Sequence, residues 1–156
     1  MMEPIDFNEC KCIVEYGPGT GVFTDEVVKR KRAATVFIVI EQNKEFFLRL
    51  KNRYYNVPNL ILINGDASDV EQYLMDQNLS SADYIISGLP FTSLPGQVSD
   101  RILTATKRVI GEKGRFITFQ YTLLKRKFFE QYFQIRGITL EFKNLPPAYV
   151  FTMKNR

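Results

Sequence analysis

Apolar positions along the chain follow two alternating patterns. Short runs of mostly apolar residues predict buried strands. Val36–Ile40 is the clearest of them, because a continuous apolar run is typical of a strand covered on both faces. Between these runs apolar residues recur at helical spacing, as Phe46, Phe47 and Leu50 do within Asn43–Tyr54. Strands and helices are therefore expected to alternate along most of the chain.

The boundaries of these elements follow from the apolar runs and from the Gly, Pro and Asn residues between them. The predicted strands are Cys12–Tyr16, Val36–Ile40, Leu60–Ile63, Asp83–Ser87, Arg115–Tyr121, Ile138–Lys143 and Ala148–Met153. The predicted helices are Val22–Arg30, Asn43–Tyr54, about Asp69–Met75, Ser99–Ile110 and Lys125–Gln134. The last two strands are joined by Asn-Leu-Pro-Pro (144–147), a connection that suits a terminal antiparallel pair.

Alternating strands and helices predict a parallel sheet with helices on both faces. We therefore expect one α/β domain over residues 1–156, with a Rossmann-like, doubly wound, seven-stranded sheet. This sheet is expected to be mostly parallel, with an antiparallel C-terminal strand. Right-handed crossovers leave a crevice at the carboxyl ends of the strands, where the strand order reverses. Residues that carry chemistry are expected at that edge.

Composition is typical of a soluble globular protein, with 45% apolar and 24% charged residues. No apolar run is long enough to span a bilayer, and the N-terminus lacks a signal-peptide pattern, so a cytoplasmic location is expected. The chain contains no histidine, which removes the usual general base and the commonest metal ligand. Cys10 and Cys12 are expected to be reduced strand residues, and no metal site is expected.

Two basic clusters accompany the net charge of +4. Such clusters suit phosphates, in RNA or in lipid headgroups. For Lys29–Arg32 the alternative is a solvated helix end, where cations complement the helix dipole. Lys125–Lys127 precedes the aromatic residues Phe128, Phe129, Tyr132 and Phe133, and together they suggest contact with an anionic membrane. The alternative there is a core-facing helix with basic first-turn residues.

The strongest functional signal is the string Ile-Val-Glu-Tyr-Gly-Pro-Gly-Thr-Gly at residues 13–21. An apolar strand runs into three alternating glycines, Gly17, Gly19 and Gly21, and a helix follows. Glycines let a ligand lie against the backbone, and the helix start presents free N–H groups. This arrangement is typical of a nucleotide-type cofactor site. The alternative is a tight turn with no ligand.

Acidic residues occur at the ends of three predicted strands. Glu41 lies 20 residues past Gly21, where a carboxylate can accept bonds from both hydroxyls of a ribose. Asp66 follows the third strand, and its carboxylate can accept a bond from an exocyclic amine such as N6 of adenine. Glu15 lies just before the glycine turn and can bind an ammonium group directly or through water. The alternative for each is a helix cap or an exposed loop residue.

A fourth turn, Ser87-Gly-Leu-Pro-Phe91, follows the fourth predicted strand. Glycine and proline fix a rigid turn whose carbonyls can accept bonds from an amine substrate. The ring of Phe91 is suited to stacking on a flat or cationic group. The alternative is an ordinary strand-to-helix loop.

Taken in order, the glycine turn, Glu41, Gly65-Asp66-Ala67 and residues 87–91 resemble a class I S-adenosylmethionine-dependent methyltransferase, over nearly the whole chain. Within that superfamily the chain most resembles bacterial phospholipid N-methyltransferases, which methylate phosphatidylethanolamine. Their Ser-Gly-Leu-Pro turn and Asn-Leu-Pro-Pro-Ala stretch are similar to residues 87–90 and 144–148. Next come the ribosomal RNA adenine dimethyltransferases, with an Asn-x-Pro-Tyr/Phe turn. Glycine 88 takes the amide-bearing position here, which weakens the adenine-N6 interpretation.

The resemblance implies a role for each residue and S-adenosylmethionine as the cofactor, with S-adenosylhomocysteine as product. The cofactor's methionine part would be held by Glu15, Gly17, Gly19 and Gly21, its ribose by Glu41, and its adenine by Asp66 with Ala67 against the ring edge. Ser87, Leu89 and Phe91 would border the acceptor amine, of a phospholipid or of an RNA adenine.

Two departures from these families affect the expected activity. The chain begins about ten residues before its first predicted strand, whereas the lipid enzymes have additional N-terminal helices that help close the site and meet the membrane. No helical domain follows Arg156, although the ribosomal RNA enzymes have one that grips RNA. We therefore expect a catalytic core without a lid, in which cofactor binding survives better than turnover. A non-catalytic cofactor-binding module is the remaining alternative.

Overall fold

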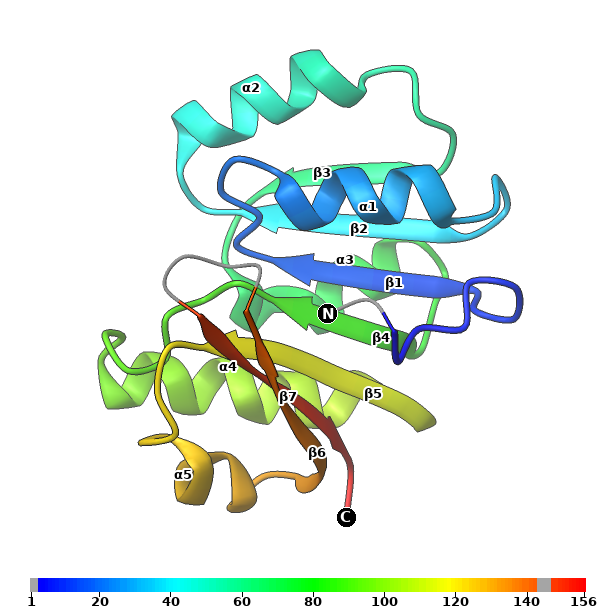
Figure 1. Ribbon diagram of the computed structural model, residues 1–156. Coiled ribbons are helices and arrows are strands. Elements are labelled where there is room, and N and C mark those ends of the chain that lie inside the picture. The colour runs from blue at the N-terminus through cyan, green and yellow to red at the C-terminus, as the bar shows by residue number, and fades with distance from the viewer. Residues whose placement is uncertain (1–2, 143–146) are drawn as a thin grey trace.

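The computed structural model describes residues 3–142 and 147–156. Over these residues the chain forms a seven-stranded sheet in the order β3-β2-β1-β4-β5-β7-β6 (Figure 1). The strands are β1 (Cys12–Tyr16), β2 (Val36–Glu41), β3 (Leu60–Asn64), β4 (Ala82–Ser87), β5 (Ile110–Gln120), β6 (Gln134–Glu141) and β7 (Ala148–Lys154). The helices are α1 (Val22–Arg30), α2 (Lys44–Tyr54), α3 (Val70–Asp76), α4 (Gly96–Val109) and α5 (Arg126–Glu130), with a short 3-10 helix at Ala67–Asp69.

The sheet is parallel from β3 to β5, and β7 pairs antiparallel with both β5 and β6. The predicted α/β class, the mostly parallel sheet and the terminal antiparallel pair are therefore confirmed. Three of the four residues of the predicted Asn-Leu-Pro-Pro connection, 144–146, lie outside the described residues. The strand order reverses between β1 and β4, which places the predicted crevice at the carboxyl ends of these two strands.

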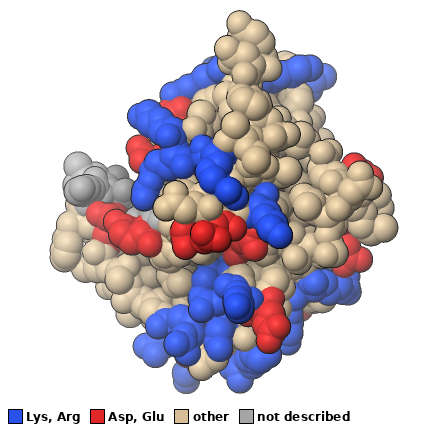
Figure 2. Space-filling model, turned by 90° about the vertical axis from the view of Figure 1, so that its right-hand side faces the viewer, with Lys and Arg blue, Asp and Glu red and all other residues tan. Residues whose placement is uncertain are grey.

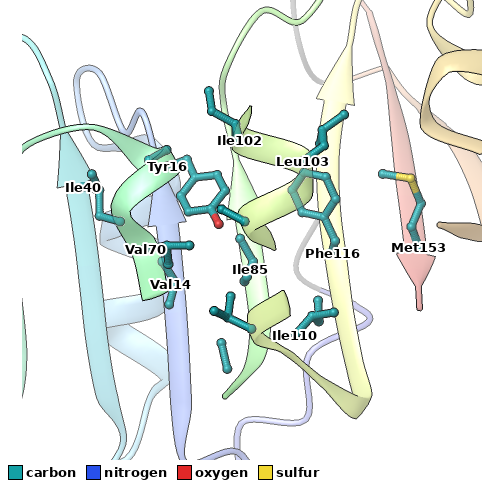
Figure 3. Packing of buried hydrophobic residues seen from close by; sticks show 14 of the residues in the cluster. Val14, Tyr16, Ile40, Val70, Ile85, Ile102, Leu103, Ile110, Phe116 and Met153 are labelled. Carbon is teal, nitrogen blue, oxygen red and sulfur yellow. The ribbon is translucent and has the colours of Figure 1, made fainter. Parts of the chain in front are cut away.

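Alternate residues of the central strands supply two separate hydrophobic cores. Ile13 of β1 packs on the side of α1 and α2, whereas Val14 and Tyr16 pack on the side of α3, α4 and α5. Figure 3 shows this second core, where Tyr16, Ile85 and Phe116 of the sheet lie against α4. Both faces of the central strands are thus covered, which explains why their sequences are mostly apolar.

Several element boundaries differ from the prediction. Helix α4 begins at Gly96 instead of Ser99, since Pro95 precedes it and fixes the entry of the chain. Strand β5 begins at Ile110 instead of Arg115, because an irregular register opposite Ala82 and Tyr84 extends the pairing beyond the apolar run. Helix α5 ends at Glu130, four residues earlier than predicted. The apolar spacing of residues 128–133 is helical, but Gln134 already belongs to β6.

Candidate functional site

The glycine turn joins β1 to α1 at the carboxyl edge of the sheet. Gly17, Gly19 and Gly21 all have positive φ angles, of 61°, 58° and 91°. L-residues with a side chain rarely adopt this conformation. The N–H of Gly17 donates to the Ile40 carbonyl of β2 at 2.9 Å, so the turn stays attached to the neighbouring strand. The three glycines are therefore required by the backbone path of the turn.

A cavity of about 590 Å³ lies beside this turn, at the carboxyl ends of β1, β2, β3 and β4. Five predicted site residues line it: Gly17, Glu41, Asp66, Ala67 and Leu89. Its other lining residues are Ile40, Gln42, Asn43, Gly65, Leu94, Pro95, Val98, Arg101 and Ile102. The structure thus brings the ends of the first four strands together at one site, with helix α4 forming the opposite wall.

Glu41 has a carboxylate that is nearly buried but still lines the cavity. Its two oxygens accept N–H bonds from Gly19 at 3.1 Å and from Asn43 at 3.0 Å. A carboxylate offers about four acceptor positions, so two hydroxyl donors can be added to these bonds. The two backbone bonds fix the orientation of the group between the glycine turn and the start of α2.

Asp66 caps the short helix that follows β3. Its Oδ1 accepts bonds from the backbone N–H and from the hydroxyl of Ser68, both at 2.8 Å. The capping role that the sequence left as an alternative is therefore present, and Asp66 lines the cavity as well. Because both bonds reach the same oxygen, the cap and a ligand bond to the other oxygen are compatible.

Glu15 lies beneath the glycine turn instead of lining the cavity. Its side chain is buried, and the hydroxyl of Thr24 in α1 donates to it at 2.6 Å. Burial raises the pKa of Glu15 to about 8, the carboxylates of Glu41 and Asp25 add to the rise, and the Thr24 hydrogen bond opposes it. The sequence suggested that Glu15 binds a ligand ammonium directly or through water, but its carboxylate does not line the cavity. The observed geometry gives Glu15 the role of joining β1 to α1.

The turn after β4 is held by a ladder of polar side chains from β5. Thr118 donates its hydroxyl to the Ser87 carbonyl at 3.1 Å, and the side-chain amide of Gln120 donates to the Leu89 carbonyl at 3.2 Å. The hydroxyl of buried Ser87 accepts the Leu89 N–H at 3.1 Å. Of the three residues predicted to border an acceptor, only Leu89 lines the cavity. Ser87 acts within the turn itself.

Phe91 does not border the cavity. Its side chain is fully buried and makes edge-to-face contacts with Phe116 and Phe129, at centroid distances of 6.5 and 5.5 Å. The expectation that its ring stacks on an acceptor is therefore wrong for this structure. The ring belongs instead to the hydrophobic core on the side of α4 and α5, in the same cluster as Phe129.

Gly88 packs directly against the glycine turn. A Cβ atom at position 88 would lie 2.9 Å from the Gly17 carbonyl oxygen, which is backbone and cannot move aside easily. Its N–H also donates to the Tyr16 carbonyl at 3.0 Å. The sequence showed only that an amide was missing at this position. The structure adds that the close approach of two turns leaves no space for one.

Several residues of the site were not predicted from the sequence, and three of them have polar or charged side chains at the acceptor turn or on α4. Gln120 and Thr118 support the acceptor turn, and Arg101 of α4 lines the cavity. The polar residues at positions 118 and 120 interrupt the apolar run 116–121, and this pattern indicates a structural role for them. Arg101 carried no such signal, because an exposed arginine on a helix is ordinary.

The basic cluster Lys29–Arg32 lies at the edge opposite the cavity. Helix α1 runs away from the glycine turn and ends there. Lys31 donates to the carbonyls of Thr35 and Pro58, and Arg32 donates to that of Cys10. Figure 2 looks onto this edge and shows Lys and Arg in two groups separated by a band of Asp and Glu. Lys31 and Arg32 of the basic cluster therefore connect loops at this edge and do not face the cavity.

Cys10 and Cys12 are both buried and free, and burial raises the pKa of Cys12 to about 12. Among the described residues no group of His, Cys, Asp and Glu could hold a metal ion. Within the same part of the chain, no helix is long and apolar enough to cross a bilayer.

Comparison with known proteins gives close matches in two functional groups. A model of the family described as "Ribosomal RNA adenine dimethylase" matches residues 2–137. An ornithine lipid N-methyltransferase of Singulisphaera acidiphila is 30% identical over 146 residues, which cover 92% of this chain and 76% of that protein. A probable ribosomal RNA small subunit methyltransferase A of Pyrococcus furiosus is 36% identical over 58% of this chain, but only 32% of that protein is covered.

Solved structures agree with the fold. The N-methyltransferase NodS of Bradyrhizobium japonicum, solved with S-adenosyl-L-homocysteine, superposes with a TM-score of 0.75 at 9% identity, covering 94% of this chain and 78% of that one. The fibrillarin pre-rRNA processing protein of Methanococcus jannaschii gives 0.72 at 15% identity, covering 93% and 66%. Together with the cavity and the glycine turn, these matches show that the chain belongs to the ribosomal RNA adenine dimethylase family and is an S-adenosylmethionine-dependent methyltransferase.

Proposed function

We propose that the chain methylates the primary amine of a membrane lipid headgroup, of the phosphatidylethanolamine or ornithine lipid type. The observation that carries this proposal is the contact between Gly88 and Gly17, which excludes a side chain at position 88. In the ribosomal RNA enzymes that this chain resembles, an amide stands at that position. Similarity to an ornithine lipid N-methyltransferase over 92% of the chain supports the same choice.

The residues around the cavity fit the proposed cofactor. Gly17 lines the cavity, whereas Gly19, where an added Cβ atom meets nothing within 4 Å, lines a smaller cavity with Thr20. The carboxylate of Glu41 would hold the ribose hydroxyls, Asp66 the adenine amine, and Ala67 the ring edge. The bound cofactor supplies an electrophilic methyl group on a sulfonium, whose departure as a neutral thioether needs no acid.

The protein's own contribution is to align the reacting groups and to exclude water from them. Leu89, Leu94, Pro95 and Val98 give the cavity an apolar wall beside the acceptor turn. A lipid amine must be neutral to attack, and an apolar wall favours the neutral form by disfavouring the charged one. Alignment of the amine, the methyl carbon and sulfur lowers the barrier to methyl transfer in such a site. This chemistry requires no histidine, and the chain has none.

A methyl-transfer assay with separate acceptors tests the proposal. The protein is incubated with labelled S-adenosylmethionine and vesicles that contain phosphatidylethanolamine, ornithine lipid or only lipids without a primary amine. We expect label in one or both amine lipids and none in the control vesicles. Label in a ribosomal RNA transcript alone would favour adenine methylation, the second candidate, which the family match supports. Binding of S-adenosylhomocysteine without methylation of any acceptor would indicate a non-catalytic module.

A further inference from the structure

We propose that the segment that joins β5 to α5 docks the protein on an anionic lipid bilayer and turns the cavity toward the headgroups. This segment is called the β5–α5 loop and comprises residues 121–125. The proposal rests on the proposed function for its biological purpose. The surface itself follows from exposure, charge and position, which are independent of the acceptor.

Three large apolar side chains of the β5–α5 loop face solvent. Tyr121 is 60% exposed, Leu123 42% and Leu124 83%. The sequence assigned lipid contact to aromatic residues that follow the loop, but two of these, Phe129 and Phe133, are fully buried in the core. The apolar surface therefore lies just before the aromatic residues, where the loop projects. Neighbouring exposed apolar residues on a soluble fold often mark an interaction site.

Basic residues directly follow the apolar ones. Lys125 lies over the ring of Phe128, 4.6 Å from its centroid, and Arg126 and Lys127 are exposed in the first turn of α5. Over residues 121–130 these three cations are accompanied by one carboxylate, Glu130, which pairs with Arg126 at 3.3 Å. Apolar side chains that insert, backed by a net positive charge, are complementary to an anionic bilayer. This charge pattern favours a lipid surface over a second copy of the chain, which carries the same positive charge there.

The loop begins next to the acceptor turn. Strand β5 ends at Gln120, whose amide contacts the Leu89 carbonyl at 3.2 Å, and Leu89 lines the cavity. In Figure 1 the loop leaves β5 on the side where β1, β2 and β4 also end. Phe142, which is 71% exposed, extends the same edge. It follows Glu141, the last residue of β6, which pairs with Ala148 of β7. The next residue of β7, Tyr149, pairs with Gln120 at the end of β5. A membrane that contacts the loop would therefore present its headgroups to the cavity.

The loop has a rigid base, so its side chains are presented without a large ordering cost. The N–H of Arg126 donates to the Leu123 carbonyl at 3.0 Å, and the N–H of Leu124 donates to the Thr122 hydroxyl at 3.2 Å. Phe129 anchors the following helix turn by an edge-to-face contact with Phe151 of β7, at a centroid distance of 5.3 Å. A preorganised loop loses less conformational entropy when it binds.

Vesicle flotation tests this surface. The full chain is mixed with phosphatidylcholine vesicles, with or without phosphatidylglycerol, and neither lipid offers a primary amine to the cavity. We expect binding to the anionic vesicles, weaker binding to the neutral ones, and a reduction of about tenfold or more in affinity with Leu124→Glu. The matched control is Tyr55→Glu, since Tyr55 is 82% exposed but follows α2 at the opposite edge, and it should bind like the wild type.

Further measurements separate a failure of docking from a failure of the proposed function. Thermal melting and calorimetry with S-adenosylhomocysteine should be unchanged in Leu124→Glu, because the side chain is exposed and away from the cavity wall. Vesicle binding without methylation of any lipid would support the docking proposal but contradict the proposal that a lipid amine is the methyl acceptor. Absence of wild-type binding to anionic vesicles, or equal binding by Leu124→Glu, would overturn the docking proposal. Loss of self-association or of RNA binding in Leu124→Glu, with vesicle binding intact, would overturn it as well.

Discussion

Carboxylates that resemble one another in the sequence are held in very different ways at the site. Glu41 faces the cavity and is oriented by two backbone N–H groups, whereas Glu15 is buried under the turn against Thr24. Asp66 combines a helix cap with a place in the cavity wall. The sequence could predict that acids occur at strand ends. It could not predict which of them reach the cavity, because that depends on the packing of α1 against β1.

The first prediction at the residue scale concerns Glu41. Replacing its carboxylate with an amide in Glu41→Gln removes an acceptor for ribose hydroxyls and inserts donors opposite the Gly19 and Asn43 N–H groups. We expect the affinity for S-adenosylhomocysteine to fall about 10- to 100-fold, as for the loss of a charged hydrogen-bond partner. Calorimetry measures this directly. Glu45→Gln, on an exposed face of α2, is the control, and an equal effect there would refute the assignment.

A second prediction follows from the raised pKa of Glu15. The pKa of Glu15 is 4.5 in the unfolded chain and about 8 in the folded protein, so folding takes up a proton at Glu15 when the pH lies between these two values. The contribution of protonated Glu15 to stability is complete below pH 4.5 and is lost as the pH rises through about 8. The free energy of unfolding should fall over this range, by at most about 5 kcal/mol. Urea denaturation of the wild type and of Glu15→Gln over this range measures the difference, and parallel pH profiles would contradict the prediction.

Phe91 gives a third prediction, on stability instead of acceptor binding. Because its ring is buried between Phe116 and Phe129, Phe91→Ala should destabilise the protein by about 3–5 kcal/mol. Denaturant unfolding is the appropriate measurement. Phe142→Ala, at a 71% exposed position, should change stability by less than about 0.5 kcal/mol. A normal stability for Phe91→Ala together with a selective loss of turnover would restore the original role of Phe91 as an acceptor contact.

At the element scale, strands β1 to β4 were predictable because their runs are mostly apolar and end in turn residues. The boundaries that failed are those where pairing overrides the local pattern. Strand β5 starts in Ile-Gly-Glu-Lys-Gly, which is polar and glycine-containing and is held by pairing with β4. Apolar residues have helical spacing over 128–133, but α5 ends at Glu130 because Gln134 already pairs with Lys154 of β7. Long-range pairing of this kind leaves little trace in a local window.

The prediction at this scale concerns the end of β5. In Gln120→Leu the amide that supports the Leu89 carbonyl and the Thr118 hydroxyl is lost, with little change of volume. We expect the rate of methyl transfer to fall about tenfold or more, because the acceptor turn is less well positioned, while affinity for S-adenosylhomocysteine changes less than about twofold. Steady-state kinetics and calorimetry separate the two. Gln72→Leu on exposed α3 should leave both unchanged, and a matching loss of cofactor affinity in Gln120→Leu would contradict a positioning role.

At the scale of the whole molecule, the position of the site at the strand-order reversal followed from the sequence, because topology alone places it there. The glycine turn and three acids were predicted at this edge for the same reason, but only Glu41 and Asp66 of those acids line the cavity. What could not be predicted is the choice of exposed face. The sequence gives Leu123, Leu124, Phe129 and Phe133 equal apolar character, but only the last two reach the core. The membrane-facing surface proposed here depends on that distinction.

A crystal structure of the protein with S-adenosylhomocysteine tests the central claim most directly. We expect the ligand in the cavity at the carboxyl edge, with its ribose hydroxyls on the Glu41 carboxylate, its adenine beside Asp66 and Ala67, and its sulfur toward Leu89. Ligand density at another place on the molecule, or contacts with the ribose that do not include Glu41, would contradict the assignment of this edge as the methyl-transfer site.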